Sequence, residues 1–325
     1  MSKPNASFIL TAALALACTG ILGCAGESAR PGHLMWRQTG NSLALLNEGN
    51  IVWQLNYDKR YDKPYFHPIA LADGTVLTDN GPADHPWHRG LWWSWKFING
   101  VNYWEENPKT RLAPGRSEIT GVKVTTRPDG NAEAQFTVEY HPPGKAVKVS
   151  EKRTLKVSPP DEKGVYRIDW TSTFSADDGD VLFGRTPIIG EPCGVIWGGY
   201  AGLSVRLAKD AGNWRAADSE GHVFDKEFNN AKARWLDYTI QAGSAGTEAG
   251  IAILDHPSNP RHPTPWYVIL GDPMRYFSPA FIYDQPFTLA SGKLLKLRYR
   301  VLVHPGRTDR KWLENEWANF SKTER

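Results

Sequence analysis

The side chains best suited to chemistry in this 325-residue chain gather between residues 84 and 106. A first run, residues 84–93, reads DHPWHRGLWW, and a second, residues 99–106, reads NGVNYWEE. Imidazoles and carboxylates transfer protons, guanidinium groups bind oxyanions, and indole faces stack on the C–H faces of sugar rings. Together these groups predict a tryptophan-lined carbohydrate cleft better than they predict a core.

Two sets of candidate residues follow from these runs and their neighbours. The first set contains ionisable groups for catalysis, including a later glutamate that is equally typical of a turn. The second set surrounds the first and would bind substrate. The catalytic candidates are His85, His88, Arg89, Glu105 and Glu191, and the first substrate-binding candidates are His67, Trp87, Trp92 and Trp104.

A second loop, residues 254–266, reads LDHPSNPRHPTPW and follows an apolar strand. Four prolines stiffen it, and a rigid loop of polar side chains holds sugar hydroxyls at a low ordering cost. A stiff surface connection is the alternative interpretation. The further substrate-binding candidates in this loop are Asp255, His256, Asn259, Arg261, His262 and Trp266.

The histidines also allow a metal hypothesis. His67, His85 and His88 are candidate ligands for a divalent cation, with Asp84 or Glu105 completing the shell. A His-x-x-His spacing without a helix or cysteine partners is not diagnostic of zinc. No cofactor is therefore assigned, and a divalent metal remains an alternative. A structural role, with polar groups rimming a tryptophan-rich core edge, is a second alternative.

These groups must be positioned by strands. Apolar residues alternate with polar ones over 134–140, 166–174 and 295–303, which is typical of half-buried antiparallel strands. Turn sequences such as PDGN, PPG and DDGD separate them. Apolar residues at helical spacing over 308–323, with Thr308 as N-cap, predict one C-terminal helix. Residues 25–325 are thus expected to form one all-β, two-sheet antiparallel sandwich with that helix.

Composition narrows the partners. The formal charge is +3 and no Lys/Arg-rich run occurs, so nucleic acid is not expected as a partner. Residues 1–24 read as a lipoprotein-type export signal in which Cys24 becomes the lipidated residue, because an apolar stretch over 8–22 is too short for a membrane span. Ordinary secretion is the alternative. We expect a periplasmic or outer-membrane-anchored protein, in contact with membrane only through its lipid.

The quoted motifs resemble the bacterial PmoA-like family, a domain of unknown function. Its inherited label of methane oxygenase subunit conflicts with the sequence, which has no run of about 20 apolar residues after the signal. The strand pattern is also similar to galactose-mutarotase-like sandwiches. That similarity implies a histidine acid, His85 or His88, and an opposing base, Glu105, Glu106 or Glu191, with Arg89 binding a carboxylate or hydroxyl. The late glutamate expected for a mutarotase is missing from residues 287–292.

The resulting hypothesis is an exported enzyme that cleaves a glycosidic bond in an oligosaccharide or polysaccharide, by hydrolysis or elimination. A hydrolase needs flanking acids, whereas a lyase needs a base and a cation or metal that stabilises an enolate. The alternatives are a sugar epimerase and a non-catalytic surface carbohydrate-binding lipoprotein.

Overall fold

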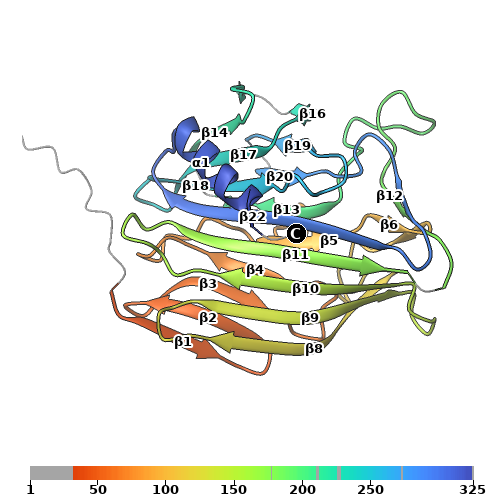
Figure 1. Ribbon diagram of the computed structural model, residues 1–325, viewed down its shortest axis with the longest axis horizontal. Coiled ribbons are helices and arrows are strands. Elements are labelled where there is room, and N and C mark those ends of the chain that lie inside the picture. The colour runs from red at the N-terminus through yellow and green to blue at the C-terminus, as the bar shows by residue number, and fades with distance from the viewer. Residues whose placement is uncertain (1–31, 177, 210–211, 225–227, 272–273, 324–325) are drawn as a thin grey trace, which may run out of the picture.

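The protein is an all-β sandwich with one C-terminal helix, as predicted (Figure 1). The computed structural model describes residues 32–176, 178–209, 212–224, 228–271 and 274–323. The predicted export signal, residues 1–24 with Cys24, lies outside these ranges. In the ranges described, no helix has the length and apolar character needed to cross a membrane.

Two nine-stranded antiparallel sheets and one small sheet build the molecule. The first sheet, in spatial order, contains β1 (Leu34–Gln38), β2 (Ser42–Asn47), β3 (Asn50–Asn56), β4 (Tyr65–Ile69), β5 (Leu91–Ser94), β13 (Gly202–Arg206), β20 (Tyr276–Pro279), β19 (Pro265–Ile269) and β16 (Phe228–Lys232). The second contains β15 (Val223–Phe224), β14 (Gly212–Asp218), β17 (Trp235–Ala242), β18 (Thr247–Asp255), β22 (Leu294–Pro305), β11 (Tyr166–Ser175), β10 (Val149–Val157), β9 (Ala132–His141) and β8 (Arg116–Thr126). The small sheet contains β21 (Phe287–Leu289), β12 (Val181–Gly184), β6 (Phe97–Ile98) and β7 (Val101–Asn102).

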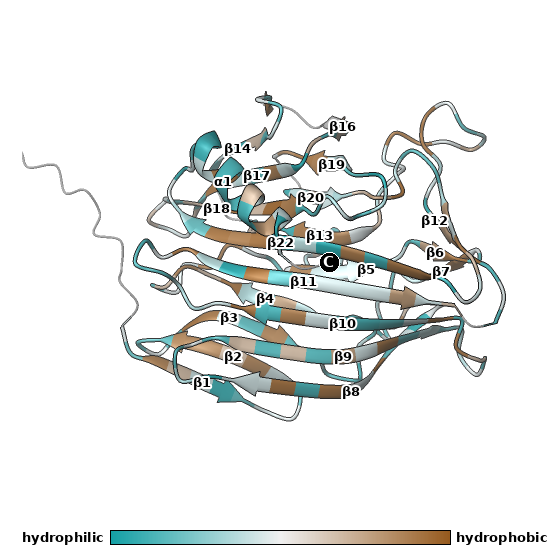
Figure 2. Cartoon of the chain, viewed as in Figure 1, coloured by the Kyte–Doolittle hydropathy of each residue, from teal (hydrophilic) through white to brown (hydrophobic). Residues whose placement is uncertain are grey.

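The core lies between the two large sheets and follows the period of two in the sequence. On β9, alternate residues from Ala132 to Tyr140 are buried, and the polar residues between them are less buried. Bands of alternating hydropathy cross β8 to β11 in Figure 2. Tyr166 joins the sheets, since its hydroxyl donates to the carbonyls of Val52 and Ala70 at 3.2 and 3.0 Å. The predicted alternation over 134–140, 166–174 and 295–303 is confirmed in its main lines.

The helix α1 (Arg310–Ser321) packs on the second sheet, close to β18 (Figure 1). Its N-cap is Asp309, whose side chain accepts from the Trp312 amide at 2.7 Å, so the predicted cap was wrong by one residue. The Thr308 hydroxyl instead donates to Asp237 at 3.2 Å. Leu313 and Phe320 are buried beneath the helix, as their spacing predicted.

Many of the 14 tryptophans of the chain belong to the core. The fully buried indoles between or beside the sheets are those of Trp53, Trp93, Trp95, Trp170, Trp235 and Trp266. Large aromatic side chains bury much apolar area and fill the wide space between two sheets. The high tryptophan count therefore reflects packing as much as any ligand.

Candidate functional site

An aromatic pocket of about 430 Å³ opens on the outer face of the first sheet. Loops supply most of its walls, and β19 and β20 supply the rest. The residues that line this aromatic pocket are His85, Trp87, His88, Trp104, Glu105, Trp197, Tyr200, Tyr267, Ile269, Met274 and Tyr276.

Strand alternation separates the aromatic pocket from the core. On β5, Trp92 packs in the cluster under the pocket, whereas its neighbour Trp93 packs between the sheets. On β20, Tyr276 and Phe277 divide in the same way. Successive side chains of a strand point to opposite faces. Trp92 is thus buried below the pocket, where it contacts His88 at a ring-centroid distance of 5.1 Å, and it does not line the surface.

The loop that carries His85 and His88 is fixed by turns. The amide of His85 donates to the carbonyl of Pro82 at 3.1 Å, and the amide of His88 donates to that of His85 at 2.9 Å. Gly90 brings the loop against β4, where a Cβ atom would lie 2.3 Å from the carbonyl oxygen of Phe66. Any larger residue at this position would displace the loop from the sheet.

His85 is held by a carboxylate. Its Nδ1 lies 2.9 Å from Asp84, which also accepts from Nη2 of Arg206 at 2.8 and 2.9 Å. Burial opposes ionisation of Asp84, but the hydrogen bonds from His85 and Arg206 hold its pKa below the usual range. An ionised carboxylate only accepts, so Nδ1 of His85 carries the proton and Nε2 is left to exchange one. Such an arrangement suits an acid or base.

His88 lies deeper and is 3% exposed. Its ring stacks on His85 at 4.5 Å and on Tyr276 at 5.4 Å between centroids. Burial, with a further contribution from the charges around it, holds the pKa of His88 well below its ordinary value. The imidazole is therefore neutral, and its buried Nδ1 has no hydrogen-bond partner among the described residues. A buried polar atom without a partner costs free energy that a ligand hydroxyl would recover.

Glu105 supplies the carboxylate of the aromatic pocket. Asn102 positions it, since its side-chain oxygen accepts from the amide of Glu105 and its Nδ2 donates to the Glu105 carboxylate at 2.6 Å. Lys96 and the Tyr200 hydroxyl donate to the same carboxylate. Burial opposes ionisation of Glu105, but Lys96 outweighs it and lowers the pKa. The pocket thus contains an ionised carboxylate that is held in place by its ion pair with Lys96.

Arg89 does not face the aromatic pocket, contrary to its predicted catalytic role. It is 2% exposed and binds Glu106, which also accepts from Nζ of Lys63 at 2.8 Å. Lys63 donates in addition to the Trp104 carbonyl at 2.6 Å, and Arg89 and Arg111 both donate to the Pro86 carbonyl at 2.9 Å. This buried ion cluster joins the two segments that carry the histidines and Glu105.

Glu191 also lies outside the aromatic pocket. It forms a bidentate ion pair with Arg185 at 2.7 and 2.8 Å and accepts from the amide of Ile188. The Arg185 hydrogen bonds, followed by that of the amide, lower the pKa of Glu191 to about 2. Its role is to hold the loop that brings Trp197 and Tyr200 to the pocket. Trp197 is 52% exposed at the rim.

The second predicted loop, residues 254–266, does not meet the histidine loop in the aromatic pocket. Asp255 is buried, and its carboxylate accepts from Nδ1 of His262 and Nδ2 of Asn259, both at 2.7 Å. His256 accepts from the Arg298 guanidinium at 3.0 Å beside α1. These polar groups stabilise the loop and α1.

The remaining residues of that loop have other neighbours. Arg261 donates to the carbonyls of Phe281, Gln285 and Pro286, and with His262 it borders a separate hollow of about 450 Å³. Trp266 is fully buried in the core and donates to the Ala233 carbonyl at 3.0 Å, so a substrate cannot reach its indole.

The metal hypothesis finds no support in the described ranges, where no group of three or more His, Cys, Asp or Glu side chains is arranged to hold an ion. His67, on β4, is not among the residues that line the aromatic pocket, and its Nδ1 lies 3.0 Å from the Thr78 hydroxyl. Burial lowers the pKa of His67. The three candidate histidines therefore do not form a shell.

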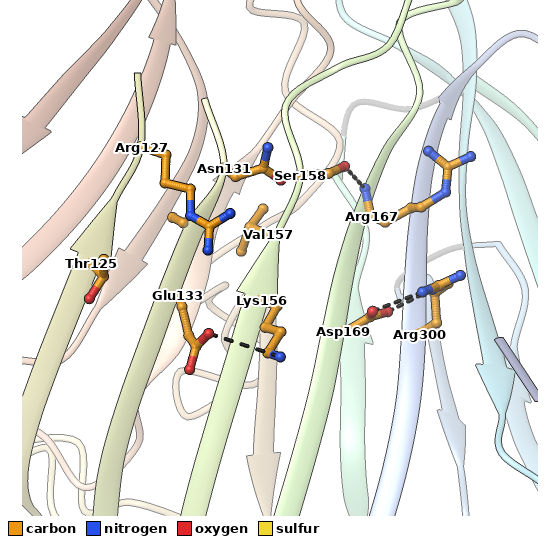
Figure 3. A pocket seen from close by; sticks show the side chains of 11 residues that line it. Thr125, Arg127, Asn131, Glu133, Lys156, Val157, Ser158, Arg167, Asp169 and Arg300 are labelled. Carbon is orange, nitrogen blue, oxygen red and sulfur yellow. Dashed lines mark hydrogen bonds and ion pairs between the residues drawn. The ribbon is translucent and has the colours of Figure 1, made fainter. Parts of the chain in front are cut away.

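A second hollow, of about 470 Å³, lies on the outer face of the second sheet (Figure 3). Four of its charged groups form two pairs, Arg300 with Asp169 at 2.6 and 2.8 Å and Lys156 with Glu133 at 4.0 Å, and Arg167 binds Glu316 of α1. None of its lining residues is aromatic. A surface of paired charges on flat strands explains this hollow without a ligand, so the aromatic pocket is the candidate site.

Several residues of the aromatic pocket were missed from the sequence. Trp197 and Tyr200 flank a Gly-Gly pair, which predicts a loop but does not show that the loop lies beside the histidines. Tyr267 and Ile269 show the strand period of two on β19, and nothing in the sequence shows which face is outer. Tyr276 and Met274 carry no local signal.

A comparison with known protein families assigns the chain to one of them. A model described as a family of unknown function, DUF6807, matches residues 42–318, which is most of the chain. The chain belongs to this family. The DUF6807 segment contains every residue that lines the aromatic pocket, as well as the buried ion cluster and α1 up to residue 318. No curated protein matches the chain.

Proposed function

We propose that this protein is an exported carbohydrate-active enzyme that transfers protons on a sugar bound in the aromatic pocket. The observation that carries the proposal is the Asp84–His85 pair, which orients an imidazole at a pocket walled by indole and phenol rings. Aromatic faces bind the C–H faces of sugars, and an oriented imidazole serves as a general acid or base. Glu105 adds an ionised carboxylate in the same pocket.

The reaction that these groups support best is hydrolysis of a glycosidic bond. The imidazolium form of His85, which carries a proton on each nitrogen, donates the Nε2 proton to the glycosidic oxygen as the bond from that oxygen to the anomeric carbon breaks. Glu105 stabilises the positive charge that develops on the ring. Water then adds its hydroxyl to the anomeric carbon and returns a proton to His85. Elimination is less well supported, because it needs a cation beside the enolate and none of the described lining residues is Lys or Arg.

Sugar epimerisation is a second candidate, favoured by one observation. Among the described residues, those that line the aromatic pocket include one carboxylate, that of Glu105, together with two histidines. A glycosidase usually employs two carboxylates. A histidine acid and a glutamate base would open and close a pyranose ring by moving one proton each.

The experiment that tests the proposal compares the protein with a His85→Gln variant and a His222→Gln control, whose side chain is 60% exposed in another part of the fold. Release of 4-nitrophenol from neutral 4-nitrophenyl glycosides reports hydrolysis, and polarimetry of fresh α-glucose and α-galactose reports epimerisation. We expect turnover in one assay that His85→Gln abolishes. Sugar binding without turnover in either assay would favour a non-catalytic binding protein, and absence of both would overturn the proposal.

The export of the protein is proposed from residues 1–24 alone. We expect the chain to fractionate with the outer membrane and a Cys24→Ser variant to be released as a soluble periplasmic protein. A cytoplasmic location of both forms would contradict this part of the proposal.

A further inference from the structure

Three buried cations near the aromatic pocket are bound to carboxylates. Arg206 binds Asp84, Lys96 binds Glu105 and Arg89 binds Glu106, and each of the three cations is at most 5% exposed. None of them is among the residues that line the pocket. A carboxylate that entered would lose its water, and the described lining residues offer no guanidinium or ammonium group to replace it.

The lining groups instead favour an uncharged ligand with hydroxyl groups. Glu105 presents an ionised carboxylate whose cation, Lys96, is already bound to it, so it accepts hydrogen bonds from hydroxyls and offers a second carboxylate no counter-charge. His88 also lines the pocket, and its buried Nδ1 lacks a partner among the described residues. The volume of about 430 Å³ is near the lower end of the roughly 300–1,000 Å³ typical of small-molecule sites. It suits one or two sugar rings.

From these contacts we infer that the substrate is a neutral mono- or disaccharide unit and that acidic sugars, such as uronates, are excluded by charge. The inference rests on the proposed function, because it assumes that the aromatic pocket binds a sugar. It narrows that function to neutral glycans and assigns Glu105 as a specificity-determining residue. The predicted role of Arg89 in binding a carboxylate is replaced by its structural role with Glu106.

The test uses matched ligands at pH 7, where uronate carboxyls are ionised. Quenching of tryptophan fluorescence gives dissociation constants for phenyl β-glucoside, phenyl β-glucuronide and the uncharged methyl ester of the glucuronide, and for the corresponding galactose series. We expect the neutral glycoside to bind at least tenfold more tightly than the uronide in any series that binds. The methyl ester should recover most of this loss, because it keeps the size and removes the charge.

Two variants separate charge from shape. Glu105→Gln removes the negative charge and should reduce the ratio of the uronide dissociation constant to that of the neutral glycoside several-fold. Glu118→Gln changes an exposed residue on β8 and should leave this ratio unchanged. Equal or tighter binding of a uronide, or a methyl ester that binds as poorly as the acid, would overturn the inference while the proposed function stands. Failure of all of these sugars to bind would overturn the proposed function and the inference with it.

Discussion

The imidazole rings of His85 and His88 stack with their centroids 4.5 Å apart and an angle of 24° between their planes, although the two side chains differ in exposure and in hydrogen-bond partners. His85 is partly exposed and bound to Asp84, whereas His88 is buried and its Nδ1 is unpartnered within the described ranges. His85 can therefore act as an acid or base, while His88 remains neutral and contacts the ligand. The predictions below follow from this division and from the contacts that hold it.

Replacing His88 by Phe should have opposite effects on folding and on binding. Phe keeps the stacked ring but removes a buried nitrogen that has no partner in the described part of the unbound protein. We expect the free energy of unfolding to rise by up to about 1 kcal/mol, and sugar affinity to fall by a factor of about 2 to 12, the equivalent of one hydrogen bond. Chemical denaturation and fluorescence titration measure the two quantities. A fall in stability, or unchanged affinity, would contradict the role given to Nδ1.

Replacing Asp84 by Asn should slow turnover more than it weakens binding. The amide no longer requires the proton of His85 to be on Nδ1, so the tautomer that acts at Nε2 is depleted. General acid–base catalysis contributes roughly 10² to 10⁴ in rate, and we expect at least a tenfold loss of kcat. Steady-state kinetics on whichever substrate is turned over provide the measurement. Asp73→Asn, in a surface turn, is the control and should retain full kcat.

Replacing Glu106 by Gln should lower the free energy of unfolding more than replacing any other carboxylate near the site. Lys63 and Arg89 would remain buried without their anion, a loss of about 3 to 5 kcal/mol. Urea denaturation of Glu106→Gln beside the exposed Glu118→Gln measures the difference. A change below about 1 kcal/mol would show that the buried ion cluster does not depend on its shared carboxylate.

The rim tryptophan Trp197 should contribute to binding with little effect on stability. Its indole is 52% exposed at the pocket, so Trp197→Ala removes a stacking face without opening the core. We expect affinity for a neutral sugar to fall by a factor of about 2 to 12, the range for an aromatic contact of 0.5–1.5 kcal/mol. Trp36→Ala, on the edge strand β1, serves as the matched change away from the pocket. Equal affinities for the two variants would exclude Trp197 from the site.

The stability of the protein should fall as the pH is lowered from about 6.5 to 4, in part through His256. Burial and the Arg298 guanidinium, with smaller effects of His262 and Lys296, lower the pKa of His256 to about 4. Between these pH values His256 is protonated in the unfolded chain but not in the folded chain. The free energy of unfolding therefore decreases by up to about 1.4 kcal/mol for each unit by which the pH is lowered. His256→Gln should reduce this slope, whereas His222→Gln should not. Parallel slopes for wild type and His256→Gln would refute the assignment.

The sandwich could be predicted because alternation on a strand is local. Residues 134–140 show their buried face without knowledge of any neighbour. The site was predicted only in part. His85, His88, Trp87, Trp104 and Glu105 were found because they are close in sequence, and they meet in one pocket. Arg89 and Glu191 were assigned by residue type, but the acids and bases that bind them are set by tertiary contacts.

The fate of loop 254–266 shows the same limit. Its polar side chains looked suited to a ligand, yet Asp255, Asn259 and His262 bind one another, and the loop supports α1. A polar cluster that satisfies itself and one that awaits a ligand have the same composition. Only the hydrogen-bond partners distinguish them, and these depend on where the two sheets place each loop.

The short strand β5 has a consequence for how this family can diversify. Its residues have two structural roles. Trp92 supports the floor of the aromatic pocket, and Trp93 fills the space between the sheets, where it packs against Phe174 and Tyr299. A substitution that reshapes the floor must therefore also preserve the packing of the sandwich. The exposed rim residue Trp197 faces no such double demand. New ligand preferences should accumulate at the walls of the pocket, while its floor stays the same from one relative to the next.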